Sequence, residues 1–284
     1  MHPRLLLERL GLHASKARGQ NFLTQPATAQ AIVASAAIGP EDFVVEIGPG
    51  LGALTVAAGR LASRVLAVEI DRGVHRALMD VLAEEGLQNV EARLMDALDL
   101  DWPATREQAG RPLVVIGNLP YNITSPLLFA LLAAAPCWRA ATLMVQKEVA
   151  TRLAAKPGGK DWGRLGVMVQ SLCQVRAGVT LSRGQFFPEP NVSSQIVHLT
   201  PLEQPLPAAL GLSQAWFGQV VKAAFGQRRK TVANALAGGL GLERGRVEDA
   251  LGRAAVAPSR RAETLSIAEL GAIALALTPP GPPN

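Results

Sequence analysis

The stretch "FVVEIGPGLGALT" at residues 43–55 decides the fold, because an apolar run ends at a cluster of glycines and a helix-like segment follows. Apolar runs of this kind alternate with helix-like segments such as 51–62 and 72–85. The runs lie at 43–48, 64–70, 90–95, 112–118 and 141–146. Strands that are covered by helices on both faces have this composition. The alternation therefore predicts an α/β domain with an open, doubly wound, largely parallel sheet.

The pattern changes in the second half of the chain. Residues 166–181 and 194–200 are predicted to be two further strands that pair antiparallel at one edge of the sheet. The segment 201–212 carries three prolines and predicts a linker, and the Ala-, Leu- and Arg-rich sequence after it predicts helices. We therefore expect one domain over residues 1–203 and a smaller helical domain over 204–284.

Composition limits the class of protein. The chain has 284 residues, 49% of them hydrophobic and 18% charged, which is typical of a folded, soluble protein. Its net charge of +5 is concentrated in residues 222–261, where nine basic residues face three acidic ones, and a local basic field of this kind suits a polyanion such as nucleic acid. The two cysteines do not have the spacing of a known motif, which suits free thiols in a reducing cytoplasm. The scattered histidines predict no metal site. We find neither a signal peptide nor a membrane span.

The glycine turn after the first strand indicates a nucleoside ligand without phosphates. It reads G-x-G-x-G rather than the G-x-G-x-x-G of dinucleotide sites, and the carboxylate of Glu46 before it would repel a phosphate and welcome a cation. Glu69 ends the next strand and is placed to accept both ribose hydroxyls, and Asp96 could accept from an adenine amine. S-adenosylmethionine fits this set. The alternative is a tight turn beside solvated acids.

The fourth strand ends in "GNLPYNI" at residues 117–123. In a doubly wound sheet this strand lies beside the first, so the motif should face the donor's sulfonium. The side-chain oxygen of Asn118 and the carbonyl of Leu119 could bind the hydrogens of an adenine N6 amine, and Pro120 would fix the direction of that carbonyl. Tyr121 would stack on the base. The alternative is a proline turn with a buried tyrosine.

At this point the sequence resembles the small-subunit ribosomal RNA adenine N6,N6-dimethyltransferases. The matching motifs are "GQNFL" (19–23), "VVEIGPGLGALT" (44–55), "VEID" (68–71), "MDAL" (95–98), "GNLPYNI" (117–123), "QKEV" (146–149), "WGRL" (162–165), "FFPEPNVSS" (186–194) and "FGQRRKTVANAL" (225–236). The resemblance covers roughly residues 15–270. It implies a Rossmann-like, seven-stranded S-adenosylmethionine-dependent methyltransferase domain, with residues 1–24 on the donor side, and a small all-helical C-terminal domain.

The resemblance also implies roles for individual residues. The donor would be bound by Asn21, Leu23, Gly48, Gly50, Glu69, Asp96 and Asn118. Phe186 would stack on the target adenine from the face opposite Tyr121, although "FFPEP" read alone predicts a core residue. The RNA phosphates would be held by Arg228, Arg229, Lys230, Lys156, Lys160 and Arg164.

The implied function is dimethylation of two adjacent adenines in a hairpin loop near the 3′ end of 16S rRNA, during biogenesis of the small ribosomal subunit. We expect a monomer that acts on that subunit in the cytoplasm, without a metal or a membrane. Three alternatives stay open: a non-enzymatic checkpoint on the immature small subunit, Erm-type methylation of 23S rRNA, and methylation of DNA adenine. The "QRRKT" segment at 227–231, expected on a helix, favours the small-subunit enzyme.

Overall fold

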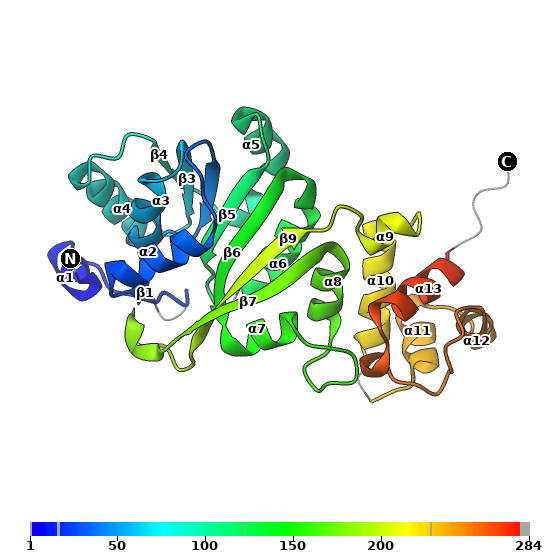
Figure 1. The fold of residues 1–284 in the computed structure, drawn as a ribbon. Coiled ribbons are helices and arrows are strands. Elements are labelled where there is room, and N and C mark those ends of the chain that lie inside the picture. Colours follow the sequence, from blue (N-terminus) through cyan, green and yellow to red (C-terminus); the bar gives the residue numbers. More distant parts are fainter. Residues whose placement is uncertain (1, 16–17, 122, 228, 279–284) are drawn as a thin grey trace. The chain divides into compact units, whose positions relative to one another are not determined.

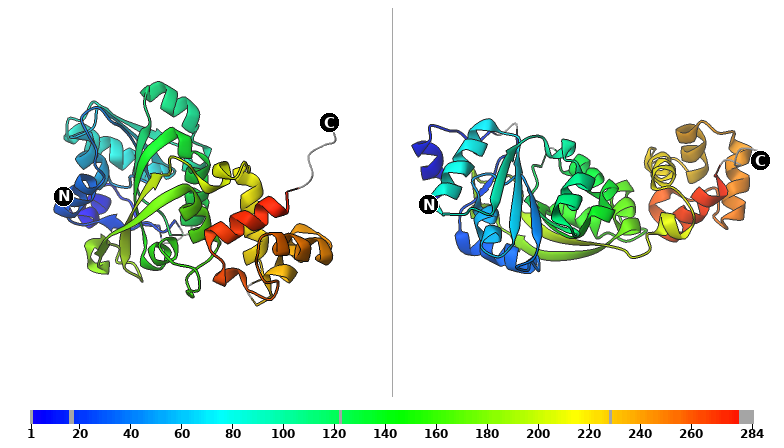
Figure 2. Two further views of the ribbon diagram at one scale, coloured as in Figure 1. Left: turned by 45° about the vertical axis from the view of Figure 1, so that its right-hand side comes forward. Right: turned by 90° about the horizontal axis from the view of Figure 1, so that it is seen from above.

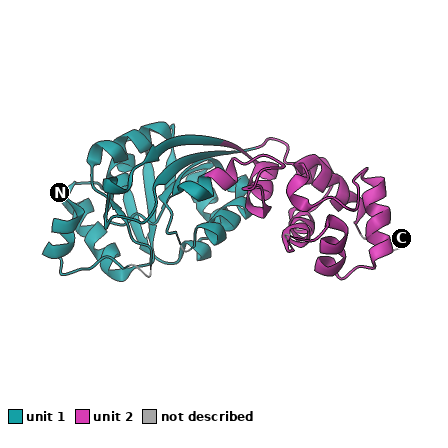
Figure 3. Ribbon diagram, turned by 90° about the horizontal axis from the view of Figure 1, so that it is seen from below, with its two compact units in different colours: residues 1–150, 176–201 teal, residues 151–175, 202–284 magenta. Residues whose placement is uncertain are grey.

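The computed structural model describes residues 2–15, 18–121, 123–227 and 229–278. The chain forms two compact units (Figure 3). Unit 1 comprises residues 1–150 and 176–201, and unit 2 comprises residues 151–175 and 202–284. Residues 151–175, which we expected in the first domain, thus group with the C-terminal helices, and the domain division at residues 203 and 204 stays a prediction.

Within the described residues, unit 1 is built on a seven-stranded sheet of order β4-β3-β2-β5-β6-β9-β7 (Figure 1). The strands are β2 (Phe43–Ile47), β3 (Arg64–Glu69), β4 (Val90–Leu94), β5 (Leu113–Asn118), β6 (Trp138–Gln146), β7 (Cys173–Leu181) and β9 (Ser194–Pro201). Strands β2 to β6 are parallel, and β9 runs antiparallel to β6. The predicted α/β fold with a largely parallel sheet is confirmed.

Helices pack on the sheet because its central strands β2, β3 and β5 are buried along almost their whole length. The helices of this part of the chain are α1 (Pro3–Arg9), α2 (Pro26–Ser35), α3 (Ala53–Gly59), α4 (Arg72–Glu84), α5 (Trp102–Ala109), α6 (Thr124–Ala133) and α7 (Lys147–Leu153), with short 3-10 turns η1 (Ala97–Asp99), η2 (Ala135–Cys137) and η3 (Arg183–Gln185). Helices α2 and α3 cover one face of the sheet (Figure 2). On this face Ile32 and Leu54 share an apolar cluster with Val44, Val65 and Val114 of the strands.

The segment 166–181 corrects one prediction. Only its second half is a strand, because the first half belongs to helix α8 (Arg164–Leu172). Val167, Met168 and Val169 are all buried, and the Gln170 side chain donates to the carbonyl oxygens of Leu153 and Ala155 at 2.8 Å each. A short apolar run that is buried on every side suits a core helix as well as a strand, so tertiary packing rather than local propensity decides its structure.

Unit 2 is helical, as expected. Its C-terminal helices are α9 (Leu206–Ala209), α10 (Gln214–Phe225), α11 (Val232–Leu240), α12 (Arg244–Arg253) and α13 (Ile267–Ala276), with a 3-10 turn η4 (Ala262–Thr264). The supposed linker 201–212 contains α9, and its Leu206 and Leu210 lie so close to Gly271 that a Cβ there would come within 3.0 Å of both. No described helix is long and apolar enough to cross a bilayer.

The "QRRKT" segment is also a correction, because its described residues lie between α10 and α11 rather than on a helix. Thr231 is the N-cap of α11, where its hydroxyl accepts from the Asn234 N–H at 3.5 Å. A threonine in this position favours the start of a helix, so the basic residues before it are left in the connection.

Candidate active site

A cavity of about 290 Å³ opens at the carboxyl ends of β2, β3, β4 and β5. Its lining includes every residue that the sequence assigns to the donor. These are Asn21, Leu23, Gly48, Gly50, Glu69, Asp96 and Asn118. The N-terminal segment supplies part of the wall because β1 (Phe22–Leu23) pairs antiparallel with β8 (Phe186–Phe187), far along the chain. The structure thus gathers residues that the sequence scatters over a hundred positions.

Gly48 and Gly50 turn the chain between β2 and α3. Their φ angles are +67° and +57°, in the left-handed region that favours glycine. A Cβ at Gly48 would meet the backbone oxygen of Asn118 at 3.5 Å, and a Cβ at Gly50 would meet the Phe22 ring at 3.0 Å. The two glycines therefore let the β5 turn and the N-terminal segment approach the same pocket.

Glu69 is a buried carboxylate that the backbone holds in a fixed position. Its Oε2 accepts from the Gly50 N–H at 3.2 Å, and its Oε1 accepts from the Asp71 N–H at 2.8 Å. Burial raises the pKa of Glu69, and the two N–H groups oppose that rise because they stabilise the charged form. Each carboxylate oxygen can accept a second hydrogen bond, so Glu69 could bind a pair of vicinal hydroxyls.

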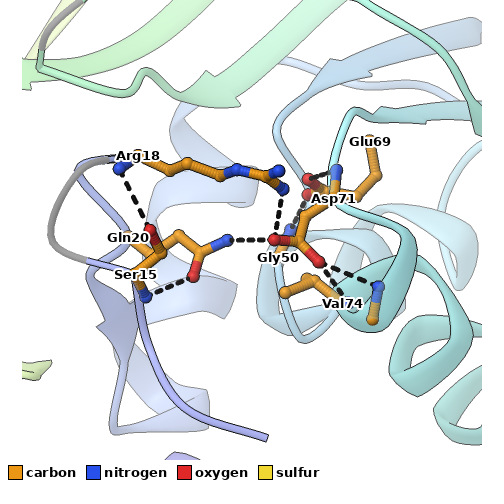
Figure 4. Close-up of polar contacts among 8 residues, drawn as sticks. Ser15, Arg18, Gln20, Gly50, Glu69, Asp71 and Val74 are labelled. Carbon is orange, nitrogen blue, oxygen red and sulfur yellow. Dashed lines mark hydrogen bonds and ion pairs between the residues drawn. The ribbon is translucent and has the colours of Figure 1, made fainter.

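Asp71 joins the N-terminal segment to this carboxylate (Figure 4). Its Oδ2 forms an ion pair with Arg18 and accepts from Gln20 Nε2 at 3.3 Å, while its Oδ1 caps α4 through the Gly73 and Val74 N–H groups. Burial would raise the pKa of Asp71, but the Val74 N–H and the Arg18 charge hold it below its usual value. Our sequence reasoning missed Arg18 and Asp71, because nothing in their spacing shows that they meet.

The surroundings of Glu46 differ from the expectation of a charged carboxylate beside the glycine turn. The side chain is only 1% exposed, and within the described residues its Oε2 has no hydrogen-bond partner. Burial raises the pKa of Glu46 to about 8, and the nearby Glu69 adds to the rise. Glu46 lines the pocket, and its burial there favours the neutral acid over the carboxylate.

The Asn118–Tyr121 turn is held from several sides. Asn118 Nδ2 donates to the Asn21 carbonyl oxygen at 2.8 Å, the Leu119 N–H donates to Met144 of β6 at 3.0 Å, and the Thr124 hydroxyl donates to the Pro120 carbonyl at 2.9 Å. Because its amide nitrogen is engaged, the carboxamide of Asn118 has a defined orientation with the oxygen as its remaining acceptor. Asn118 and Pro120 line the pocket.

The two aromatic residues of the prediction lie in different surroundings. Tyr121 is half-buried, and its hydroxyl lies 2.8 Å from the Ser194 Oγ. Phe186 is only 3% exposed and belongs to the apolar cluster beneath α2. A base could stack on Phe186 only if the face of that ring were uncovered, so its stacking role stays a prediction.

Apolar residues between the two acidic positions were absent from our sequence-based assignment. Ile70 follows Glu69 and Met95 precedes Asp96, and both line the pocket. Ile70 is 52% exposed, unusually open for an isoleucine, and such a side chain suits contact with a flat aromatic ligand. Its place directly after the strand-ending Glu69 was the signal that could have found it.

The proposed phosphate-binding residues fall in unit 2. Lys156, Lys160, Arg164, Arg229 and Lys230 are all exposed, and Lys160 and Arg164 take part in interactions within the protein. Arg228 lies outside the described residues. Basic side chains that remain accessible to solvent suit the binding of a phosphate backbone.

Comparison with known proteins narrows the assignment. The model of the family "Ribosomal RNA adenine dimethylase" matches residues 11–277. A protein of Desulforapulum autotrophicum named Ribosomal RNA small subunit methyltransferase A is 42% identical over 97% of this chain and 96% of its own, and one of that name from Pelotomaculum thermopropionicum is 43% identical over 95% and 94%. A dimethyladenosine transferase from Plasmodium falciparum superposes with a TM-score of 0.73, at 26% identity over 89% of this chain and 95% of its own. The 23S rRNA methyltransferase ErmE superposes with a TM-score of 0.66, at 28% identity over 90% and 99%.

Proposed function

Because the chain belongs to the ribosomal RNA adenine dimethylase family, we propose that it transfers methyl groups to N6 of two adjacent adenines of 16S rRNA. These adenines lie in a hairpin loop near the 3′ end of that RNA in the small ribosomal subunit. The small-subunit name of relatives that are about 40% identical over nearly the whole chain favours this substrate over 23S rRNA or DNA. The orientation of the Asn118 carboxamide beside the pocket carries the proposal.

The pocket residues fit S-adenosylmethionine as the methyl donor. Glu69 has acceptor capacity left for the ribose hydroxyls, Ile70 and Met95 provide apolar walls for an adenine ring, and Asp96 would accept from its amine. Gly48 and Gly50 allow close approach to the backbone, and the carboxyl groups of the lining suit a cationic ligand better than a phosphate. The donor supplies an electrophilic methyl group on a sulfonium.

The Asn118–Tyr121 turn would prepare the acceptor amine. The N6 lone pair of adenine is delocalised into its ring, which makes the amine a poor nucleophile. The Asn118 side-chain oxygen and the Leu119 carbonyl would accept its two hydrogens and favour a pyramidal nitrogen, and Tyr121 would support the base. The protein would thus act by positioning and electrostatics, with no covalent intermediate.

Unit 2 would contribute much of the RNA contact. The exposed Arg229, Lys230 and Lys156 would neutralise phosphates, together with Lys160 and Arg164 of the same unit. Loop adenines can be extruded more easily than paired ones, which suits a site that receives a single base. We further propose a role in subunit biogenesis, a monomeric cytoplasmic protein, and a reaction without a metal.

The test is a methyl-transfer assay. The purified protein is incubated with labelled S-adenosylmethionine and small subunits that lack these methylations, with naked rRNA and large subunits alongside, and the RNA is digested to nucleosides. Label in N6,N6-dimethyladenosine from small subunits alone is expected. Label from large subunits would move the assignment to Erm-type methylation. No label, together with tight small-subunit binding, would leave only a checkpoint role.

A further inference from the structure

Tyr121 makes a hydrogen bond that none of the roles above uses. Its hydroxyl lies 2.8 Å from the Oγ of Ser194, the first residue of β9. Tyr121 follows β5, and β6 lies between β5 and β9 in the sheet. The ring therefore reaches across the end of one strand to contact the next. Neither residue is among those that line the donor pocket, and Tyr121 is the one of the two that is proposed to touch the substrate.

Ser194 is the fixed partner of this pair. It is 0% exposed, and its backbone is registered against Gln146 at the end of β6. The residue before it is also held, because the Ser193 carbonyl accepts from the Lys147 N–H at 2.9 Å. Tyr121 is only half-buried and lies in a connection rather than in a strand. A bond between a rigid and a less rigid group restricts mainly the latter.

We propose that Ser194 is a positioning residue for the methylation reaction, which holds the ring of Tyr121 in the place where it supports the target adenine. This inference rests on the proposed function. The hydroxyl of a tyrosine lies on the axis about which its ring rotates, so the bond leaves the ring free to turn and fixes where its tip lies. It therefore selects one χ1 well among the three that a tyrosine can occupy.

The composition of the chain offers a direct readout, because Tyr121 is the sole tyrosine in the sequence. With Cζ-labelled tyrosine, its ionisation can be followed as one NMR resonance during a pH titration. Burial raises the pKa of Tyr121, and the hydrogen bond to Ser194 opposes that rise because it stabilises the phenolate. In Ser194→Ala we therefore expect the pKa of Tyr121 to rise further. In Ser193→Ala, the matched control, it should stay at the wild-type value.

The kinetic test is a double-mutant cycle on transfer to small subunits. Tyr121→Phe keeps the ring and removes the hydroxyl, so it breaks the same bond without changing Ser194. A neutral hydrogen bond of ordinary strength predicts a loss of roughly 2- to 10-fold in kcat/KM for each single variant. The double variant should lose no more than either single one, because both remove one bond. Ser193→Ala should retain the wild-type rate, and urea unfolding would verify that every variant is folded.

Several outcomes would overturn the inference. If the wild type transfers methyl groups and Ser194→Ala does so equally well, Ser194 does not position Tyr121. Losses that multiply in the double variant would mean that the two residues act independently. If Ser194→Ala does not fold, a wild-type rate in Tyr121→Phe would by itself reject the role. A wild type without transfer activity would remove the proposed function and the inference together. The assay of the wild type therefore distinguishes a failure of the proposed function from a failure of the inference alone.

Discussion

Asn118 shows how one contact can set the chemistry of a side chain. Its amide nitrogen is held by the Asn21 carbonyl, which leaves the oxygen to accept from the substrate. We expect Asn118→Ala to lower kcat by about 100-fold or more, the scale on which loss of one preorganised polar group acts. Small-subunit binding should be nearly unchanged and can be measured by sedimentation. A variant that also fails to bind would show that transfer and docking are not separable at this residue.

Glu46 should make the stability of the folded protein depend on pH. Its folded pKa of about 8 exceeds the ordinary carboxyl value of 4.5, so the folded state binds more protons than the unfolded state between these two values. The stability of the wild type should therefore fall as the pH rises through this range. Glu46→Gln should remove that fall and gain up to about 5 kcal/mol over the wild type above pH 8, with a difference of less than about 1 kcal/mol at pH 5. Urea unfolding of the ligand-free protein at pH 5, 7 and 8.5 measures it, and parallel curves for the two proteins would contradict it.

At the scale of elements, the turn between β2 and α3 depends on the N-terminal segment. Gly50 has a φ of +57°, and a Cβ there would come within 3.0 Å of the Phe22 ring in β1. We expect Gly50→Ala to lower the free energy of unfolding by about 1–2 kcal/mol and to weaken donor binding at least tenfold. Calorimetry with S-adenosylmethionine tests the second effect. Gly86→Ala is the matched control, because Gly86 has a similar φ of +67° but open space around it.

The sequence predicts some elements well and others poorly, for reasons that the residues make clear. The strands ending at Ile47, Glu69 and Asn118 combine β-branched residues with glycines or acids at their ends, and these local signals predict that the strand ends lie at one edge of the sheet, where the structure has its pocket. The predictions for helix α8 and for the connection before α11 were wrong. Tertiary packing decides the structure of the first, and the N-cap of α11 decides that of the second. The ion pair of Arg18 with Asp71 and the contact of Tyr121 with Ser194 depend on distant residues, so spacing could not reveal them.

At the scale of the whole molecule, the carboxyl-end pocket belongs to unit 1, and the residues that we propose to bind RNA phosphates belong to unit 2. If Arg229 and Lys230 of unit 2 bind phosphates, the affinity for small subunits should fall steeply with salt. The double variant Arg229→Ala/Lys230→Ala should bind more weakly at low salt, and its log–log salt slope should be smaller by about 1 for each phosphate that is no longer neutralised. Filter binding at several salt concentrations measures the slope. Arg111→Ala, in unit 1, is the control, and an equal change in both variants would contradict a specific role for unit 2.

The pairing of β1 with β8 has a consequence for how the protein is made. Phe22 is registered against Phe187, and β6 is covered on one edge by β9. When the first 150 residues have been synthesised, the chain holds all the parallel strands and the glycine turn, but neither β8 nor β9 has been made. At ordinary rates of translation the chain segment from residue 151 to residue 201 takes about 3–10 seconds to synthesise. During that time the N-terminal wall of the pocket has no partner strand. The nascent enzyme therefore cannot complete this wall of its pocket until residue 187 of the 284-residue chain has been synthesised.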